Sequence, residues 1–528
     1  MDWLRDRAKA TPSKLALIFE NNAWDYAELD QMTNDVCHQL IEAGAKAGEL
    51  VAMLMPATET AVCLVHAVAR LQMTLVPLNL RLTSAELSWQ LAHTQADWLV
   101  HDGAGDWGLG TEAQRLGSGA WDAIGYKTLT IQKPQLPTTN SQSTNQQTSQ
   151  LPDDQESTPN RPISQSLNLQ SPQAIVFTSG TTGNPKGVVL TFENHIWSAN
   201  ASAYRLGLLP DDRWVSCLPL YHVGGLAVIF RSCLYGTAVI LHQKFDLDAI
   251  NHSLDVHGGT MISVVPTMLY RLLETRDYWP DTLRLILVGG AAASPALVEQ
   301  ANRLERKNVE GKGQKIAAPK PPIVSTTYGL TEAASQVATQ TPEDTAKKPG
   351  SVGKPIMFSN VRIVDKNGRS LPVNKIGEVV VSGRTVMQGY FANEQATVET
   401  IQDGELYSGD VGYLDEDGDL WLVQRRSDII VTGGENVYPA EVEKVLKSHP
   451  AIKEICVAGI PSAEWGELVA AMIVLENNQC VDTETLSAYG RKQLAGYKQP
   501  RHIQFTDALP LTGSGKIHRK RVKELLDS

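Results

Sequence analysis

The sequence predicts a mixed α/β protein with a large N-terminal domain and a small C-terminal domain. A chain of 528 residues is longer than one ordinary domain, so at least two domains are expected. Short apolar runs rich in β-branched residues alternate with longer helical patterns, which is typical of parallel strands joined by helices. Acidic residues are in excess only before residue 425, because segment 425–528 is almost neutral while the whole chain has a net charge of −11. This contrast places a domain boundary near residue 425.

The alternation of strand and helix is clearest in two places. Residues 50–55 form an apolar run, and residues 58–71 continue in a helical pattern. Residues 283–288 form a second apolar run, which is followed by a helix from about Ser294. A short strand that leads into a helix is the repeating unit of a parallel sheet. We therefore expect the N-terminal domain to be built from βα subdomains.

One segment of the N-terminal domain has a different composition. Residues 138–150 consist only of threonine, asparagine, serine and glutamine. Such a tract buries too little apolar surface to offset the entropy that is lost when a chain is ordered. We therefore predict a flexible low-complexity insertion at about 133–170. It is either a surface loop with no function of its own or a glutamine-rich interaction segment.

Hairpin patterns replace the helical ones after about residue 361. Residues 361–364 and 420–423 are apolar runs, and each lies beside a turn whose glycine follows asparagine or aspartate, at 365–368 and 415–418. We expect a small β-barrel-like part at the end of the N-terminal domain, which spans 1–424. A separate α+β domain is expected over 425–528.

The composition excludes several classes of protein. With 42% hydrophobic and 20% charged residues, the chain is expected to be globular. Its negative charge provides no broad positive surface for nucleic acid. The six cysteines form no CxxC pair, which argues against a zinc site or a disulfide framework. A charged N-terminus and the lack of an apolar run of about 18 residues predict a cytoplasmic protein without stable membrane insertion.

The strongest local motif is AIVFTSGTTGNPKG at residues 174–187. A buried strand there leads into a loop whose hydroxyl groups, glycine N–H groups and one lysine, Lys186, can surround phosphate oxygens. The spacing is not that of the Walker motif, GxxxxGK[ST], because Gly187 follows the lysine in place of serine or threonine. The sequence therefore predicts a phosphate-binding loop but not a P-loop ATPase.

This loop resembles that of the acyl-adenylate-forming enzymes, a superfamily of acyl-CoA synthetases, beetle luciferases and the adenylation domains of peptide synthetases. Further motifs of the family follow in the same order: YGLTE at 328–332, YSGD at 407–410, RSD at 426–428, GGEN at 433–436 and PLTGSGKI at 510–517. The resemblance covers nearly the whole chain. It implies an enzyme that couples a carboxylic acid to ATP, forms an acyl-AMP and transfers the acyl group to a thiol. It also implies ATP, Mg²⁺ and coenzyme A as cofactors and substrates.

The resemblance indicates which residues bind the nucleotide. The candidates are Thr178, Ser179, Gly180, Thr181, Thr182, Gly183, Lys186, Gly290, Ala291, Tyr328, Gly329, Asp410 and Arg426. Thr331 would meet the α-phosphate, and the carboxylate of Glu332 would coordinate Mg²⁺, a hard cation that prefers oxygen ligands. Tyr328 would present its ring to adenine. Asp410 and Arg426 would bind the ribose hydroxyl groups.

Lys516 is the lysine that the family uses in adenylation. By resemblance it would bridge the substrate carboxylate and the α-phosphate and neutralise charge as it develops. It cannot hold that place when the thiol enters, so the family rotates its small domain about a hinge, here Asp428. The residues that this rotation would bring to the coenzyme A tunnel are Gly433, Gly434, Glu435 and Asn436.

The acyl pocket is expected near the sequence PLYHVGGL at 219–226. His222 in this segment resembles the gate that many acyl-CoA synthetases place beside the carboxylate entry. Arg231 follows an apolar run that indicates a buried helix, where an unpaired guanidinium is costly. It either pairs with an acid of the protein or binds a second carboxylate on the substrate. The catalytic candidates are therefore Lys516, Glu332, Thr331 and His222.

Two segments extend the resemblance to the o-succinylbenzoate:CoA ligases of menaquinone and phylloquinone biosynthesis, whose substrate is an aromatic dicarboxylic acid. They are residues 219–236, which contain PLYHVGGL and FRSCLYG, and residues 328–339, YGLTEAASQVAT. The residues implied to contact the acyl substrate are His222, Arg231, Gly290, Ala291 and Ser335. Arg231 would then bind the second carboxylate.

Other readings of the sequence remain open. Aryl- and medium-chain fatty acyl-CoA ligases share this framework, and the ATP motifs do not separate them from a luciferase. A peptide-synthetase adenylation domain is disfavoured because Tyr221 and His222 stand where an acid would bind an amino group. A non-catalytic binding protein on this fold would be expected to lack Lys516, Glu332 or Asp410, yet all three are present. The expected partners are a small carboxylic acid, ATP and coenzyme A, and a homo-oligomer is compatible with the sequence.

Overall fold

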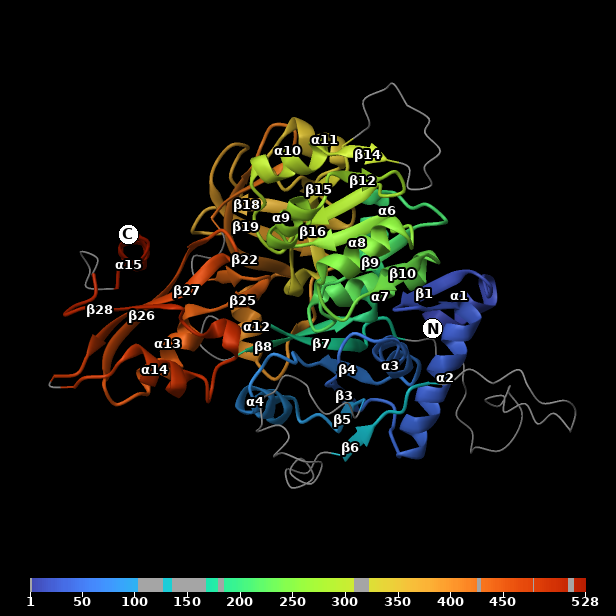
Figure 1. Ribbon diagram of the computed structural model, residues 1–528, viewed down its shortest axis with the longest axis horizontal. Helices are drawn as coiled ribbons and strands as arrows, with labels where there is room; N and C mark the ends of the chain where they lie inside the picture. Colours follow the sequence, from blue (N-terminus) through green and yellow to red (C-terminus); the bar gives the residue numbers. More distant parts are fainter. Residues whose placement is uncertain are drawn as a thin grey trace, which may run out of the picture.

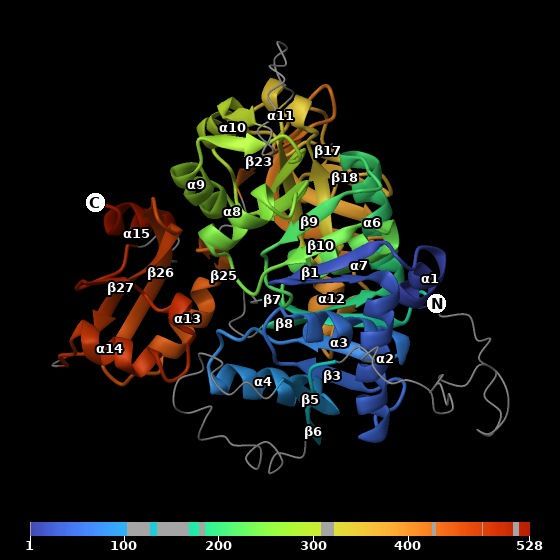
Figure 2. The same ribbon diagram turned by 45° about the vertical axis from the view of Figure 1, so that its right-hand side comes forward.

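The computed structural model describes residues 2–102, 127–134, 168–178, 185–307, 322–424, 429–477, 479–510 and 517–528. Figure 1 shows a large body that contains the N-terminus and a smaller red unit that contains the C-terminus. In the turned view of Figure 2, the small unit lies beside the edge of the body that carries α4 (Ser84–Thr94) and α9 (Pro266–Thr275). The predicted mixed α/β class, with a large and a small domain, is confirmed.

Two sheets, each parallel in its central part, form the middle of the large domain. The strands of the first, in spatial order, are β17 (Lys354–Pro355), β16 (Ser335–Thr339), β15 (Val324–Leu330), β13 (Leu285–Val288), β11 (Met261–Val264), β9 (Arg213–Ser216), β10 (Ala238–Leu241), β1 (Leu15–Phe19) and β2 (Asn22–Asp25). Those of the second are β20 (Gly389–Tyr390), β8 (Lys186–Thr191), β7 (Pro172–Thr178), β4 (Thr74–Pro77), β3 (Leu50–Met53), β5 (Trp98–His101) and β6 (Lys127–Thr130). Pairing is parallel from β1 to β15 in the first sheet and from β7 to β6 in the second. Residues at or just beyond the carboxyl ends of strands from both sheets, such as Thr178 at the end of β7 and Gly289 after β13, line one cavity.

Helices cover the sheets and share their cores. The helices that pack in one core with strands of both sheets are α1 (Trp3–Ala10), α2 (Tyr26–Glu42), α3 (Glu59–Arg70), α6 (Phe192–Leu206) and α7 (Val223–Tyr235). A second core contains strands of the first sheet and α8 (Leu247–Asp255), α9 (Pro266–Thr275) and α10 (Pro295–Arg303). A third contains strands of the second sheet and α4 (Ser84–Thr94). Short strands β12 (Tyr278–Pro280) and β14 (Glu305–Lys307) pair separately.

Local sequence explains where these helices begin. The side chain of Thr58 accepts the N–H of Ala61 at the start of α3, and the side chain of Ser294 accepts the N–H of Leu297 at the start of α10. Hydroxyl side chains at this position satisfy N–H groups that have no partner within the helix. The predicted helices at 58–71 and from about Ser294 are confirmed to within a residue or two.

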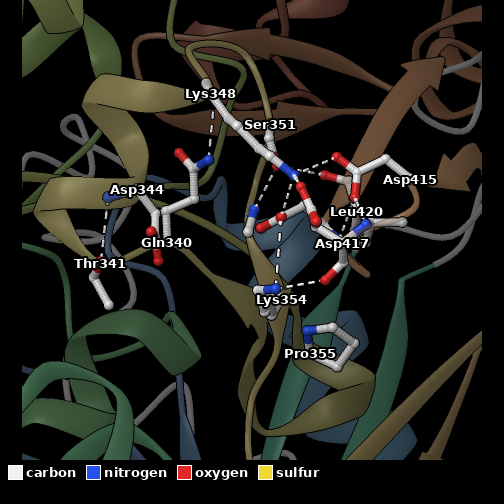
Figure 3. Close-up of polar contacts among 12 residues, drawn as sticks. Gln340, Thr341, Asp344, Lys348, Ser351, Lys354, Pro355, Asp415, Asp417 and Leu420 are labelled. Carbon is white, nitrogen blue, oxygen red and sulfur yellow. Dashed lines mark hydrogen bonds and ion pairs between the residues drawn. The ribbon is translucent and has the colours of Figure 1, made fainter.

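A third, antiparallel sheet closes the large domain, as the hairpin patterns predicted. Its strands are β18 (Ser359–Val364), β19 (Gly377–Gly383), β22 (Glu405–Leu414), β21 (Ile401–Gln402) and β23 (Leu420–Gln424), and the short helices beside it are α11 (Pro342–Lys347) and α12 (Glu394–Thr400). Figure 3 shows how Lys348, just after α11, reaches the turn between β22 and β23. Its Nζ lies 2.8 Å from Asp415, 2.7 Å from Asp417 and 2.7 Å from Asp419. The ammonium group thus occupies the centre of this acidic turn and ties it to α11.

The small domain is a mostly antiparallel sheet flanked by helices, in which β28 alone among the described strands pairs in parallel, with β27. Its strands are β25 (Glu435–Val437), β24 (Ile430–Thr432), β27 (Gly466–Leu475), β26 (Ile452–Ser462) and β28 (His502–Phe505), and its helices are α13 (Pro439–Lys447), α14 (Thr483–Gly490), the 3₁₀ turn η2 (Gly496–Lys498) and α15 (Arg519–Leu526). Apolar side chains from β24, β26, β27, α13 and α14 form its own core. The α+β character expected of this domain is confirmed.

The proposed insertion at 133–170 is described only at its two ends. Lys133 forms an ion pair with Glu59 at 2.5 Å, and Leu169 packs on the main core. The tract at 138–150 lies outside the described residues, so its flexibility remains a prediction. Among the helices that the structure describes, none is both long and apolar enough to cross a membrane.

Candidate functional site

A cavity of about 960 Å³ lies between the two domains at the ends of the central strands. The predicted site residues that line it are Thr178, His222, Arg231, Gly290, Gly329, Thr331, Glu332, Ser335, Asp410, Gly433, Gly434, Glu435 and Asn436. They come from motifs that are far apart in the sequence. The fold therefore brings most of the described candidates to one cavity.

The phosphate-binding loop connects two adjacent antiparallel strands. Thr178, the last residue of β7, pairs with Lys186, the first residue of β8. The Nζ of Lys186 lies 4.8 Å from the centre of the Tyr390 ring, and the Tyr390 hydroxyl donates to Oε1 of Glu332 at 2.8 Å. Thr178, Lys186 and Glu332 are thus held in one neighbourhood on the cavity side of the sheet.

A tight turn presents the YGLTE motif to the cavity. Strand β15 ends at Leu330 and a single 3₁₀ turn, η1 (Thr331–Ala333), follows. The chain then passes through positive φ angles of 52° at Ala334 and 97° at Ser335. A Cβ on Gly329 would lie only 1.7 Å from the carbonyl oxygen of Ser335, so this position requires glycine. The turn brings Thr331, Glu332 and Ser335 together at the cavity wall.

The donor set fits a magnesium nucleotide. Glu332 is a largely buried carboxylate, 9% exposed, that lines the cavity beside the hydroxyl of Thr331. Asp410 offers a second carboxylate on the same cavity, and Thr178 a second hydroxyl. Hard oxygen donors of this kind are those that Mg²⁺ prefers, and it usually bridges one or two of them to substrate phosphates. Glu332 is the residue best placed to hold the ion.

Tyr328 differs from the expected adenine contact. Its ring is 1% exposed, and its hydroxyl donates to Oδ2 of Asp410 at 2.6 Å. Because side chains alternate along β15, the neighbours Thr327 and Gly329 face the cavity instead. In this structure Tyr328 therefore orients Asp410, the candidate ribose ligand.

The loop after β13 contributes one of its two predicted residues. Gly290 lines the cavity and has a positive φ of 79°, a conformation that glycine adopts without strain. Among the described residues that line the cavity, Ala291 is absent. A role for Ala291 in binding adenine or the acyl group remains a prediction.

Arg231 lies in the middle of α7 and is 3% exposed. Its Nη2 donates to the hydroxyl of Ser198 at 3.0 Å, its Nε has no partner among the described residues, and its guanidinium lies 6.0 Å from the Trp214 ring. Burial lowers its pKa. Within the described part of the chain no acid forms an ion pair with it, yet it lines the cavity. For the first predicted role, pairing with an acid of the protein, the described residues offer no partner.

Glu435 of the small domain is bound by side chains of the large domain. Its Oε1 accepts from Arg81 at 3.0 Å and from the hydroxyl of Tyr221 at 3.1 Å, and its Oε2 lies 3.1 Å from Nε2 of His222. Burial would raise the pKa of this carboxyl, but His222 and Arg81 lower it to about 2. Glu435 is therefore a buried anion that joins the two domains at the cavity.

Some residues of the cavity carried no recognisable sequence signal. Arg81 and Trp465 line it from opposite domains, and Gln336 lines it from β16. Arg81 meets Glu435 across 354 positions of sequence, so no local pattern could have paired them. The alternation of β16 could have placed Gln336 on the same face as Ala338, but not in a cavity.

Several predicted site residues lie outside the described part of the chain. They are Ser179, Gly180, Thr181, Thr182, Gly183, Arg426, Asp428 and Lys516. Their roles in binding phosphate and ribose, in hinge rotation and in catalysis remain predictions.

Comparison with known proteins agrees with this geometry. The AMP-binding enzyme family matches residues 4–391, and the AMP-binding enzyme C-terminal domain matches residues 441–516. The 2-succinylbenzoate–CoA ligase of Bacillus pumilus (strain SAFR-032) is 37% identical over 522 residues, which cover 99% of this chain and 97% of that protein.

Solved structures of o-succinylbenzoate CoA synthetase from Bacillus subtilis are also similar. A double mutant bound with its product analogue OSB-NCoA has a TM-score of 0.84 at 35% identity and covers 99% of this chain and 98% of that chain. The complex with the acyl-adenylate intermediate OSB-AMP has a TM-score of 0.68 at 35% identity, with the same coverage. The complex with ATP and magnesium ion has a TM-score of 0.69 at 35% identity and covers 99% of both chains. By these matches over nearly its whole length, the chain belongs to the AMP-binding enzyme family.

Proposed function

We propose that this protein is an ATP-dependent acid:coenzyme A ligase whose acid is o-succinylbenzoate. In the first half-reaction the acid attacks the α-phosphate of ATP and releases diphosphate, which leaves an acyl-AMP. In the second, the thiol of coenzyme A attacks the acyl carbon and AMP departs. The product, o-succinylbenzoyl-CoA, belongs to menaquinone and phylloquinone biosynthesis. Oxide is a poor leaving group at neutral pH and AMP a good one, so the acid must be adenylated first.

Negative charge develops in the first half-reaction, and residues at the cavity are placed to stabilise it. Thr178 and Lys186 flank the loop that would hold the β- and γ-phosphates, and Thr331 would donate to the α-phosphate. Glu332 would hold Mg²⁺, which neutralises phosphate charge when it is bound. Asp410, fixed by Tyr328, would accept from the ribose hydroxyl groups. Gly290 would leave room for the nucleotide beside β13. Lys516 and Arg426 would complete this set by bridging the reacting groups and binding ribose.

The arrangement of the two domains supports the second half-reaction. The turn at 433–436 lines the cavity and is held by Glu435, where a coenzyme A arm would enter. Three structures of one relative, o-succinylbenzoate CoA synthetase, give a TM-score of 0.84 with the product analogue and 0.68 and 0.69 with the acyl-adenylate and with ATP. Since all three are structures of one enzyme, the difference in TM-score is best explained by a difference in the relative position of its two domains. We infer that the two domains of this chain are in the thioester-forming arrangement. Rotation about the hinge at Asp428 would give the adenylate-forming arrangement.

The observation that carries the choice of acid is Arg231. A buried guanidinium that lines the cavity and pairs with no acid among the described residues requires an anionic partner to offset its desolvation. The carboxylate that reacts lies near Thr331 and the nucleotide, so the partner of Arg231 is a second carboxylate on the same substrate. A dicarboxylic acid such as o-succinylbenzoate supplies one, whereas benzoate and octanoate do not. Gly290 and Ser335 would border the aromatic ring between the two ends.

The experiment is to compare substrate preference in the wild type and in two variants. For Arg231→Leu, kcat/KM with o-succinylbenzoate should fall about 100-fold, because a charged hydrogen-bonding partner is lost. With benzoate, the change should be no more than about threefold. Arg231→Lys keeps the charge but loses the planar fork, so an intermediate loss is expected. An unchanged preference in Arg231→Leu, or a wild type that favours octanoate, would replace this assignment with an aryl- or medium-chain acyl-CoA ligase.

A further inference from the structure

A buried ion cluster away from the cavity joins the two domains. Lys498, in η2 of the small domain, is 3% exposed, and its Nζ lies 2.7 Å from Glu441 of α13. The same Nζ lies 2.5 Å from Oε1 of Glu86, which belongs to α4 of the large domain. Glu441 and Lys498 both belong to the small domain, so their contact does not change when that domain moves. Only the bond to Glu86 depends on how the domains are placed.

Glu86 is held in position before Lys498 arrives. It is the third residue of α4, and its Oε2 accepts from the N–H of Thr83 at 2.8 Å and from the hydroxyl of Thr83 at 2.9 Å. Thr83 in turn accepts the N–H of Glu86, which completes a capping box. These two hydrogen bonds to Oε2 fix the side chain of Glu86, with Oε1 directed at the small domain. An ion pair with a side chain that is already ordered loses little rotamer entropy.

Packing around the ion cluster uses the same two segments. Ala495 of the small domain is buried in the core that contains Leu82 and Leu87 of the large domain, and Tyr497 packs against that core. The guanidinium of Arg81 lies 5.1 Å from the centre of the Tyr497 ring. The Lys498 pair with Glu86 is therefore enclosed by apolar and aromatic contacts, which exclude water and strengthen an electrostatic bond.

The charges of the cluster favour contact between Glu86 and Lys498, and this contact forms in only one arrangement of the two domains. In the small domain alone, Lys498 has Glu441 as its partner, and Oε2 of Glu441 has no hydrogen-bond partner among the described residues. Burial raises the pKa of Glu441. When the domains separate, Glu86 keeps its capping bonds and its free oxygen returns to water. When they dock, that oxygen replaces water on Lys498.

We propose that Glu86 is a positioning residue that captures the small domain in the thioester-forming arrangement through Lys498. Glu86 touches neither ATP nor the acyl group, since it does not line the cavity among the described residues. Its effect should therefore fall on the second half-reaction. The proposal rests on the two half-reactions of the proposed function and adds a residue outside the cavity that sets the balance between them.

The test uses Glu86→Gln in the full-length protein. Glutamine also serves at the third position of a capping box, so α4 keeps its start while the ion pair is lost. We expect thioester formation from supplied acyl-AMP and coenzyme A to slow about tenfold, as a close charged pair is removed. Diphosphate release in the absence of coenzyme A should stay within about twofold of the wild type. Equal losses in both half-reactions, or no loss in either, would overturn the proposal.

Two controls separate docking from simple loss of structure. Thr83→Ala removes the cap of α4 and the hydroxyl bond to Glu86 but keeps the bond from its backbone N–H to Oε2 and the ion pair, so the ratio of the two half-reactions should change far less than in Glu86→Gln. In a Lys498→Met/Glu441→Gln background, which has no ammonium to capture, adding Glu86→Gln should cause no further slowing. A further tenfold loss there would contradict the proposal.

A readout without catalysis separates a failure of this proposal from a failure of the proposed function. Hydrogen exchange of the unliganded protein should be faster in segments 79–87 and 495–498 of Glu86→Gln than in the wild type, because the docked arrangement is less populated. Unchanged exchange in both segments would count against Glu86 even if the enzyme is active. A wild type that forms no acyl-AMP, with exchange altered as expected, would reject the proposed function and leave the docking role intact.

Discussion

Two buried charged side chains at the cavity have opposite environments. Glu435 accepts bonds from Arg81 and Tyr221 and adjoins His222, and its pKa is lowered to about 2 despite burial. Arg231 has one hydroxyl partner and no described acid. The charge of Glu435 is balanced by side chains of the protein, and these contacts hold the two domains together. Among the described residues no acid balances the charge of Arg231, and this is the observation behind the proposal that its ligand carries a carboxylate.

A single glycine, Gly329, supports the turn that carries Glu332, the proposed magnesium ligand. In Gly329→Ala the new methyl group would meet the backbone of Ser335, so the turn must move. We expect the free energy of unfolding to fall by about 1–3 kcal/mol. Displacement of Thr331 and Glu332 should slow acyl-AMP formation about 100-fold. Urea unfolding and diphosphate release measure the two effects.

Gly496→Ala is the matched control, because nothing lies within 4 Å of the position that its methyl group would take. Its stability and rate of acyl-AMP formation should match those of the wild type. If Gly329→Ala behaves like this control, the close approach to Ser335 is not essential to the site.

At the scale of elements, the turn between β22 and β23 depends on Lys348. Its hydrogen bonds to Asp415, Asp417 and Asp419 raise the pKa of Lys348. Burial would raise the pKa of Asp415, but the bonds from Lys348 and Trp421 lower it to about 2. Both partners are fully charged at neutral pH, so the turn is held by ion pairs across the physiological range.

We expect Lys348→Met to lower stability in a pH-dependent way. The pKa of Asp415 is depressed below its unfolded value of about 3.9, so its contribution is complete above that pH and is lost as the pH falls toward 2. The difference in free energy of unfolding between the wild type and Lys348→Met should therefore be constant from pH 7 to pH 5 and shrink below about pH 4. Asp417→Asn should have a smaller effect, since 69% of the Asp417 side chain is exposed. A difference that grows in acid would contradict this account.

Elements and motifs were predictable from sequence where the signal is local. Strand and helix alternation, the capping residues Thr58 and Ser294 and the hairpin turns each depend on a few neighbouring residues. Thr178 ends β7 and Glu332 follows β15, and such strand ends share one edge of an α/β body, whereas Asp410 lies within β22 and reaches the site only through the fold.

The rest of the site depends on contacts between distant segments. Whether Arg231 meets an internal acid is decided by which helices and strands surround α7, and no local pattern contains that information. The bond between Arg81 and Glu435 and that between Glu86 and Lys498 join residues 354 and 412 positions apart. Tyr328 fits the motif but is turned toward Asp410 by the alternation of β15. The motif predicts a contact of Tyr328 with adenine, but the orientation of its ring is set by the fold.

At the scale of the whole molecule, the cavity is built from both domains and so changes when they move. Glu435 at the cavity and Lys498 beside it hold the small domain through two ion clusters, and Arg81 contacts both Glu435 and the ring of Tyr497. One arrangement presents the turn at 433–436, and rotation about Asp428 would present Lys516. A large acidic body and a nearly neutral small domain thus share one site for three anionic substrates.

The most direct measurement of the central claim is a competition experiment read by mass spectrometry. The wild type is given equal concentrations of o-succinylbenzoate, benzoate and octanoate with ATP, Mg²⁺ and coenzyme A. The account predicts o-succinylbenzoyl-CoA as the dominant thioester, with AMP and diphosphate formed in equal amounts. Octanoyl-CoA or benzoyl-CoA as the main product, or ADP in place of AMP, would contradict it.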